Sequence, residues 1–215
     1  MRVAASFTIS AALAVTIPVS QGNDQVHSIS KLAFPLLLLL PQVLRPDHLD
    51  DFVQCKLGRF EIVESSEIER PFTRAVPSAK GDQQVNITHG LSLHIAYEQT
   101  PFVNFKAERL GKYADDKKVL IDSIKYLGSQ EDMELGEPMP SSMNGLEVYG
   151  IHRKHLAGGV LSMYVLFGDD DLTAVTLYIL NTPPESPKFR TMEQYRALRD
   201  EFLKNFAACA GSAAR

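Results

Sequence analysis

The sequence predicts an α+β fold: an antiparallel sheet of about six strands with an internal helix and a C-terminal helix packed on it. Apolar and polar residues alternate over 91–98, which is typical of a half-buried strand. Apolar residues recur at spacings of three and four over 113–127 and again over 192–209, which indicates two amphipathic helices. Short connections join the later strand patterns, and parallel neighbours would need much longer crossovers.

The strand patterns are separated by polar connections. The expected strands are 57–64, 91–98, 103–109, 146–153, 160–167 and 172–180. Residues 65–90 are polar and rich in Ser, Pro, Gly and Asp, and within them SAKGDQQ (78–84) is expected to be an exposed loop. A second irregular connection is expected over 129–144, where Pro138 and Pro140 exclude regular structure. The pattern at 160–167 is apolar on both faces, which predicts a central strand that is covered on both sides.

Both helices carry signals at their ends. Asp115 and Asp116 stand in the first turn of the internal helix, where carboxylates suit the helix dipole, and Gly128 follows its last apolar residue. Thr191 and Gln194 form a capping box before the C-terminal helix. Its apolar face, which we interpret as a core face, comprises Met192, Tyr195, Leu198, Phe202, Phe206 and Cys209.

The residues before the predicted domain look like an export signal. Arg2 is followed by apolar residues over 3–19 and then by small residues, the pattern of a secretory signal peptide at 1–22. A second apolar run at 32–44 is shorter than the roughly 20 residues that span a membrane. We therefore expect a protein exported to the periplasm or the medium, with a single α+β domain at 47–211 and a disordered tail at 212–215.

The segment at 23–46 leaves several interpretations open. It is an apolar arm of the mature protein if 1–22 is cleaved. It is the true signal if translation starts after Met1. Alternatively, 3–19 or 32–44 associates the protein with a membrane as an anchor. A buried N-terminal helix of a cytosolic protein is the remaining alternative.

Charge and cysteine content limit the partners. The chain has 22 basic and 26 acidic residues, a net charge of −4, and no basic block, so we do not expect a nucleic-acid partner. Cys55 and Cys209 stand near the two ends of the predicted domain. In an oxidising compartment such a pair predicts a disulfide, and two unrelated thiols are the alternative.

No motif for catalysis, cofactor binding or metal binding is found. His152 and His155 lie three residues apart on a strand, so they point to opposite faces, and His89 and His94 are also an odd distance apart. Ser162 lies in an apolar strand without a nucleophile elbow and is interpreted as structural. We therefore assign no catalytic, cofactor-binding or metal-binding residue and expect no cofactor.

Two charged clusters are interpreted as solvated surface. Residues 169–171 are three aspartates in a tight turn without the calcium-loop pattern, so they predict a hairpin tip. The second cluster is expected to form a rim and comprises Glu108, Arg109, Lys112, Asp115, Asp116, Lys117 and Lys118.

The order of the elements resembles the PsbP-like family of α/β/α sandwiches. The segments that carry this resemblance are ADDKKVLIDSIKYL, LEVYGIHRKHLAGGVLSMYVLFGDDDLTAVTLYIL and TMEQYRALRDEFLKNF, and it concerns topology alone. The long insertion at 65–90 and the apolar run at 32–44 depart from the family pattern. The resemblance implies a small exported domain that binds or helps to assemble other molecules, and no functional residue of the family is carried over.

We accordingly predict a non-catalytic binding or scaffolding domain whose partner is a protein or a small ligand. The expected place for a ligand is a cleft at a sheet edge near 129–144, because long loops often carry binding sites. The alternatives are a small hydrolase or metal-dependent enzyme with a non-standard site, and a membrane-tethered structural protein.

Overall fold

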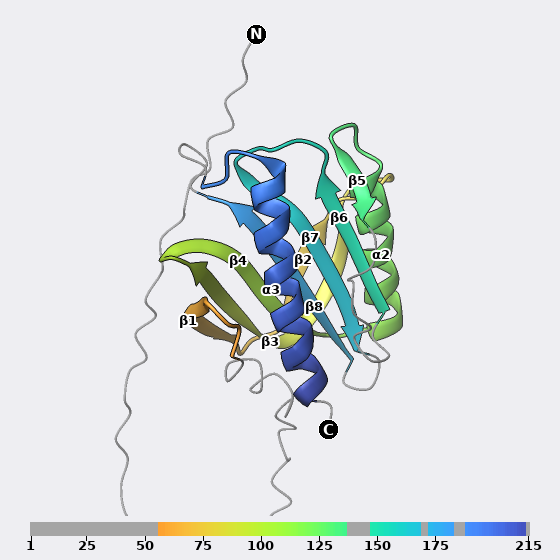
Figure 1. The fold of residues 1–215 in the computed structure, drawn as a ribbon. Coiled ribbons are helices and arrows are strands. Elements are labelled where there is room, and N and C mark those ends of the chain that lie inside the picture. Colours follow the sequence, from red (N-terminus) through yellow and green to blue (C-terminus); the bar gives the residue numbers. More distant parts are fainter. Residues whose placement is uncertain (1–55, 137–146, 169–171, 183–187, 214–215) are drawn as a thin grey trace, which may run out of the picture. The chain divides into compact units, whose positions relative to one another are not determined.

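The structure is a computed structural model, and it describes residues 56–136, 147–168, 172–182 and 188–213, with side chains as far as Cys209. In this part of the chain one antiparallel sheet carries two helices (Figure 1). The predicted α+β class is therefore confirmed. The apolar runs at 3–19 and 32–44 lie outside the described residues, so the predictions of export and anchoring remain predictions.

The sheet has eight strands, two more than expected. They are β1 (Phe60–Ile68), β2 (Phe72–Val76), β3 (Gln83–Tyr97), β4 (Thr100–Leu110), β5 (Met133–Gly136), β6 (Glu147–Arg153), β7 (Gly159–Gly168) and β8 (Thr173–Asn181). Their order is β1-β3-β4-β8-β7-β6-β5, and β2 pairs with the first half of β3 while β1 pairs with its second half.

The additional strands correct the prediction for two connections. β2 and the start of β3 lie in the polar segment 65–90, where no strand was predicted, and β5 lies within 129–144. The loop expected at 78–84 falls between β2 and β3 except for its last two residues. Both new strands are short and bury little: β2 buries Val76, and β5 has no buried residue. A strand that hides so few side chains has no strong apolar alternation, and its position depends on pairing with a neighbour.

The C-terminal helix α3 (Met192–Ala213) packs on one face of the sheet. Its buried residues join inward-facing side chains of β3, β4, β7 and β8 in one core, which we call the α3 cluster. Phe60, Phe102 and Phe202 form its aromatic centre, with ring centroids 5.2–6.1 Å apart. The predicted core face of this helix is confirmed for Tyr195, Leu198, Phe202 and Phe206, all of which are buried.

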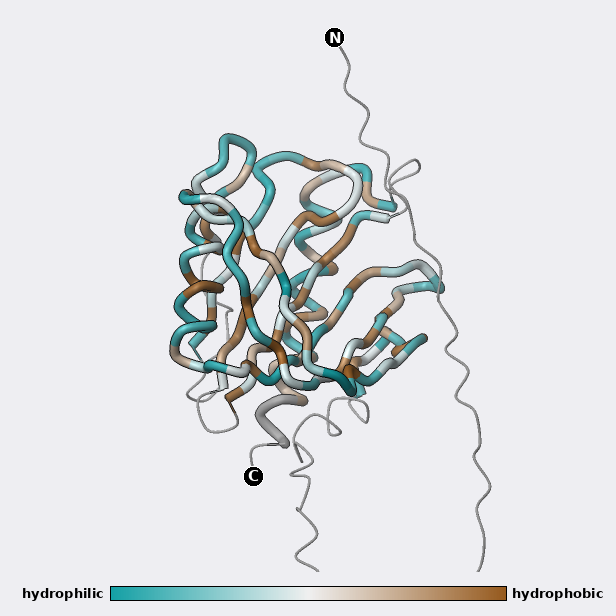
Figure 2. The backbone as a smooth tube through the Cα atoms, turned by 180° about the vertical axis from the view of Figure 1, so that it is seen from behind, coloured by the Kyte–Doolittle hydropathy of each residue, from teal (hydrophilic) through white to brown (hydrophobic). Residues whose placement is uncertain are grey.

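The internal helix α2 (Tyr113–Gly128) packs on the opposite face. Figure 2 shows that face, with α2 standing at its left side. Leu120 and Ile124 of α2 pack with Val85, Leu110 and other residues of the sheet in a second core, the α2 cluster. β7 contributes to both clusters, so its predicted central and doubly covered position is confirmed.

A β-bulge lets β3 serve both cores. The pairing of β3 with β4 shifts between Ile87 and His89, so one extra residue enters β3 at Thr88. Before the bulge, Val85 and Ile87 face the α2 cluster; after it, Leu91 and Leu93 face the α3 cluster.

The helix ends follow the sequence signals. The N–H of Gln194 donates to Thr191 Oγ1 at 3.3 Å, and Gln194 Oε1 accepts from the N–H of Arg190 at 3.2 Å. The predicted capping interaction at Thr191 is therefore confirmed. α3 extends to Ala213. Neither α2 nor α3, the two helices of the described residues, has the length and apolar character needed to cross a membrane.

Candidate functional site

Beyond α2, the same sheet face carries polar side chains on three neighbouring strands. On β4 and β8, Val103, Phe105, Leu177 and Ile179 face the α3 cluster, so the residues between them point to the other face. This polar face comprises Ser92, His94, Asn104, Lys106, Glu108, Thr176 and Tyr178. None of these side chains belongs to the apolar α2 cluster, and Glu108 and Thr176 are buried at 1% and 2% exposure.

Strand register arranges the polar face in rows. Three rows cross β3, β4 and β8: Gly90–Glu108–Ala174, Ser92–Lys106–Thr176 and His94–Asn104–Tyr178. Side chains directly opposite one another in such a row have Cβ atoms about 5 Å apart. Lys106 therefore lies between two hydroxyls, and Glu108 lies between two small residues.

Glu108 is a buried carboxylate on this face. Its side chain is 1% exposed, and Arg74 Nη1 of β2 donates to its Oε1 at 2.6 Å. No described residue donates a hydrogen bond to its buried Oε2. A buried charge is costly unless it is paired and all of its hydrogen-bonding positions are satisfied. The ion pair with Arg74 satisfies one oxygen of Glu108 and leaves the other without a donor.

Further groups of the polar face lack a protein partner. Among the described residues nothing forms a hydrogen bond or an ion pair with the side chains of Ser92, Asn104, Lys106 and Tyr178. Burial raises the pKa of Tyr178, while Arg74 lowers it and Glu108 raises it. Tyr178 therefore keeps its hydroxyl proton at neutral pH and can both donate and accept a hydrogen bond.

A second polar cluster lies between α3 and the sheet. Tyr195 donates its hydroxyl to Ser162 Oγ at 2.6 Å, and Ser162 Oγ lies 2.8 Å from His152 Nδ1. With Tyr195 as donor, the hydroxyl hydrogen of Ser162 is left for Nδ1, so the neutral His152 carries its hydrogen on Nε2. Ser162 is 0% exposed, which confirms its interpretation as a residue within the core.

Burial and the neighbouring Arg199 lower the pKa of His152 to about 4. Burial also raises the pKa of Tyr195, so the network is uncharged at neutral pH. A serine hydroxyl that donates to a neutral imidazole resembles the nucleophile and general base of a hydrolase. This hydroxyl, however, is covered by α3 and cannot contact a substrate. The arrangement holds the helix to β6 and β7.

The sequence could not reveal this pairing, because it depends on register. β6 and β7 place His152 directly opposite Ser162, ten residues along the chain. The only sequence signal is a serine in an otherwise apolar strand, which was correctly interpreted as structural.

The four histidines considered in the sequence do not come together. His152 lies under α3, and His155 is exposed in the following loop. His94 lies on the opposite face with its Nδ1 3.1 Å from Glu64 Oε2, and His89 Nδ1 lies 3.1 Å from Thr88 Oγ1. In the described parts of the chain no three His, Cys, Asp or Glu side chains are grouped to hold a metal ion.

The expected charged rim at 108–118 is wrong at two positions. Glu108 is buried on the polar face, and Asp116 is 2% exposed. Asp116 Oδ1 accepts from the backbone N–H and the side-chain amide of Asn86 at 3.1 and 2.9 Å, and Oδ2 accepts from the N–H of Lys112 at 2.7 Å. This carboxylate fastens the start of α2 to β3.

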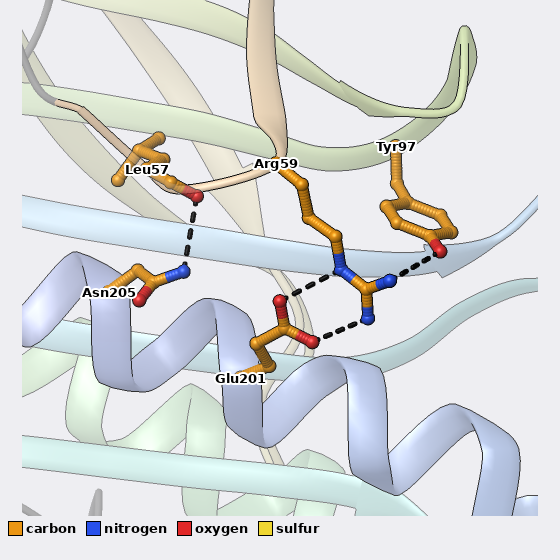
Figure 3. Close-up of polar contacts among 5 residues, drawn as sticks. All are labelled: Leu57, Arg59, Tyr97, Glu201 and Asn205. Carbon is orange, nitrogen blue, oxygen red and sulfur yellow. Dashed lines mark hydrogen bonds and ion pairs between the residues drawn. The ribbon is translucent and has the colours of Figure 1, made fainter.

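α3 is also fastened to the beginning of the domain (Figure 3). Arg59 donates to both carboxylate oxygens of Glu201 at 2.8 and 2.5 Å and to the hydroxyl of Tyr97 at 2.9 Å. One turn further along the helix, Asn205 Nδ2 donates to the carbonyl oxygen of Leu57 at 3.2 Å. These groups satisfy one another, so this cluster is a structural clasp.

Several predicted features fall outside the described residues. Cys55 does so, and the predicted disulfide with Cys209 therefore remains a prediction. The aspartates at 169–171 and the part of the 129–144 connection that follows Gly136 also lie outside, so the expected ligand cleft at that edge stays a prediction.

The fold and the two polar clusters define an α+β domain with an antiparallel sheet between helices. Comparisons with models of protein families, with curated proteins and with solved structures find no match.

Proposed function

We propose that this chain is an exported, non-catalytic binding domain that uses the polar face as its ligand-binding surface. Export rests on the signal-like pattern of the first 22 residues. The observation that carries the binding function is the unsatisfied carboxylate of Glu108, buried at 1% exposure among polar side chains on the central strands. A sheet face that served only as a solvated surface would expose such a group to water.

The arrangement favours binding over catalysis. The paired serine and histidine lie on the other face, and Ser162 is fully buried there. On the polar face, Lys106, Asn104 and Tyr178 offer charge and hydrogen bonds without a nucleophile held by a general base. A domain of this kind fits a small polar ligand that lies across β3, β4 and β8.

Nuclear magnetic resonance can test this function on the purified, isotope-labelled chain. A library of sugars, organic acids and amino acids is titrated while the backbone amide signals are followed. We expect at least one compound to shift the signals of Ser92, Lys106, Thr176 and Tyr178. Signals of α3 residues on the opposite face, such as Lys204, serve as the internal control. A library that leaves the polar face unchanged, or that shifts only α3, would contradict the proposal.

A further inference from the structure

On one strand, the polar face presents an ammonium without a described ion-pair partner and a carboxylate with one unsatisfied oxygen. Lys106 and Glu108 are two residues apart on β4, so their side chains leave the same face about 7 Å apart. Lys106 is half-buried and has no described carboxylate within ion-pair distance. Glu108 has an oxygen without a donor, while its other oxygen is held by Arg74.

The groups around each charge differ in kind. Ser92 and Thr176 flank Lys106 from the two neighbouring strands, and their hydroxyls can donate to an anion that is held by the ammonium. Gly90 and Ala174 flank Glu108, and neither has a polar side chain that could satisfy its second oxygen. The first position therefore suits a carboxylate, and the second suits a hydroxyl donor of the ligand.

We infer that the polar face binds a small organic acid that carries hydroxyl groups, with its carboxylate at Lys106 and a hydroxyl donating to Glu108. The inference rests on the proposed function and names the ligand class for the same face. Asn104 and Tyr178, in the adjacent row, supply further hydrogen bonds to the ligand's hydroxyls. A purely apolar ligand would leave Lys106 and the second oxygen of Glu108 unsatisfied. A polyanion would find only Lys106 as a cation among the described residues of this face, because Arg74 is already paired with Glu108.

The second oxygen of Glu108 is covered in the free protein. Arg74, whose side chain is 20% exposed, lies on the short strand β2 and donates to the first oxygen of Glu108. On the proposed binding mode, the side chains that cover the second oxygen of Glu108 move so that a ligand hydroxyl reaches it.

Calorimetry with three six-carbon compounds separates the two requirements. Gluconate has a carboxylate and hydroxyls, hexanoate has the carboxylate alone, and glucitol has the hydroxyls alone. We expect gluconate to bind at least about tenfold more tightly than either of the others, because each lacks one charge-assisted hydrogen bond. Equal binding of gluconate and hexanoate, or of gluconate and glucitol, would overturn the inference.

A pair of matched variants tests whether the carboxylate of the ligand binds at Lys106. Lys106→Gln is expected to weaken gluconate binding about tenfold or more and to leave glucitol binding unchanged. Lys204→Gln, on the exposed side of α3, is the control and should change neither. Retained gluconate affinity in a folded Lys106→Gln protein would overturn the inference. If none of the three compounds binds, while a compound of another class shifts the amide signals of the polar face, the inferred ligand class is wrong and the proposed function stands. If no compound shifts the amide signals of that face, the proposed function is contradicted as well.

Discussion

His152 shows how one buried side chain makes stability depend on pH. Its pKa is about 4 in the folded protein, against an ordinary value of 6.5, because burial and Arg199 disfavour the charged form. Arg196 also lowers this pKa, while Glu134 and Asp200 raise it. Between these two pH values the unfolded chain binds a proton that the folded chain does not, so stability falls as the pH drops from about 6.5 to about 4.

The replacement His152→Asn tests this dependence. Asn cannot titrate, yet its side-chain oxygen can still accept from Ser162. We expect the difference in free energy of unfolding between the original protein and this variant to change across pH 6.5 to 4 and to level off below. Urea unfolding at several pH values measures it, and His155→Asn in the exposed loop is the control. A difference that stays constant through this window would show that His152 does not titrate as described.

Among the helices, α2 depends on one carboxylate. Asp116→Ala removes the buried acceptor of three hydrogen bonds and leaves the partly buried donors of Asn86 and Lys112 without this partner. We expect a loss of about 3 kcal/mol in the free energy of unfolding. Asp115→Ala, its exposed neighbour, removes only a dipole interaction and should cost about 0.5 kcal/mol. Equal losses in the two variants, measured by urea unfolding, would contradict the assigned role.

Elements with a strong apolar pattern could be predicted, and elements defined by pairing could not. The strand at 91–98 and the helix that begins at Met192 bury a regular set of large side chains, which the sequence displays directly. β2 and β5 bury almost none, so their hydrogen bonds to β3 and β6 define them. The polar face has the same origin, because Ser92, Lys106 and Thr176 become neighbours only through register.

For the whole domain, the clasp between its beginning and α3 bears on the predicted disulfide. Arg59 contacts Glu201 of α3, and Leu57, two residues earlier in the chain, contacts Asn205, one helical turn later. Residues 57–60 form a turn, in which the N–H of Phe60 donates to the carbonyl oxygen of Leu57, and this turn lies against the C-terminal half of α3. Along the chain, Cys209 follows Asn205 by four residues, and Cys55, which precedes Leu57 by two, lies outside the described residues.

We therefore expect Cys55 and Cys209 to be linked in protein prepared without reductant. Mass measurement after alkylation, with and without prior reduction, counts the protected thiols. Reduction is expected to lower the free energy of unfolding by up to about 4 to 5 kcal/mol, because the bond closes a very long loop. A Cys209→Ser variant should be insensitive to reductant. Two thiols that alkylate without reduction would disprove the bond.

The bulge in β3 has a consequence for how the domain comes apart. The same strand contributes Val85 and Ile87 to one core and Leu91 and Leu93 to the other. Loss of contacts in either core disturbs the hydrogen-bond ladder between β3 and β4. Because this ladder supports both cores, the other core is disturbed as well. The two layers therefore melt as a single cooperative unit rather than as independent subdomains.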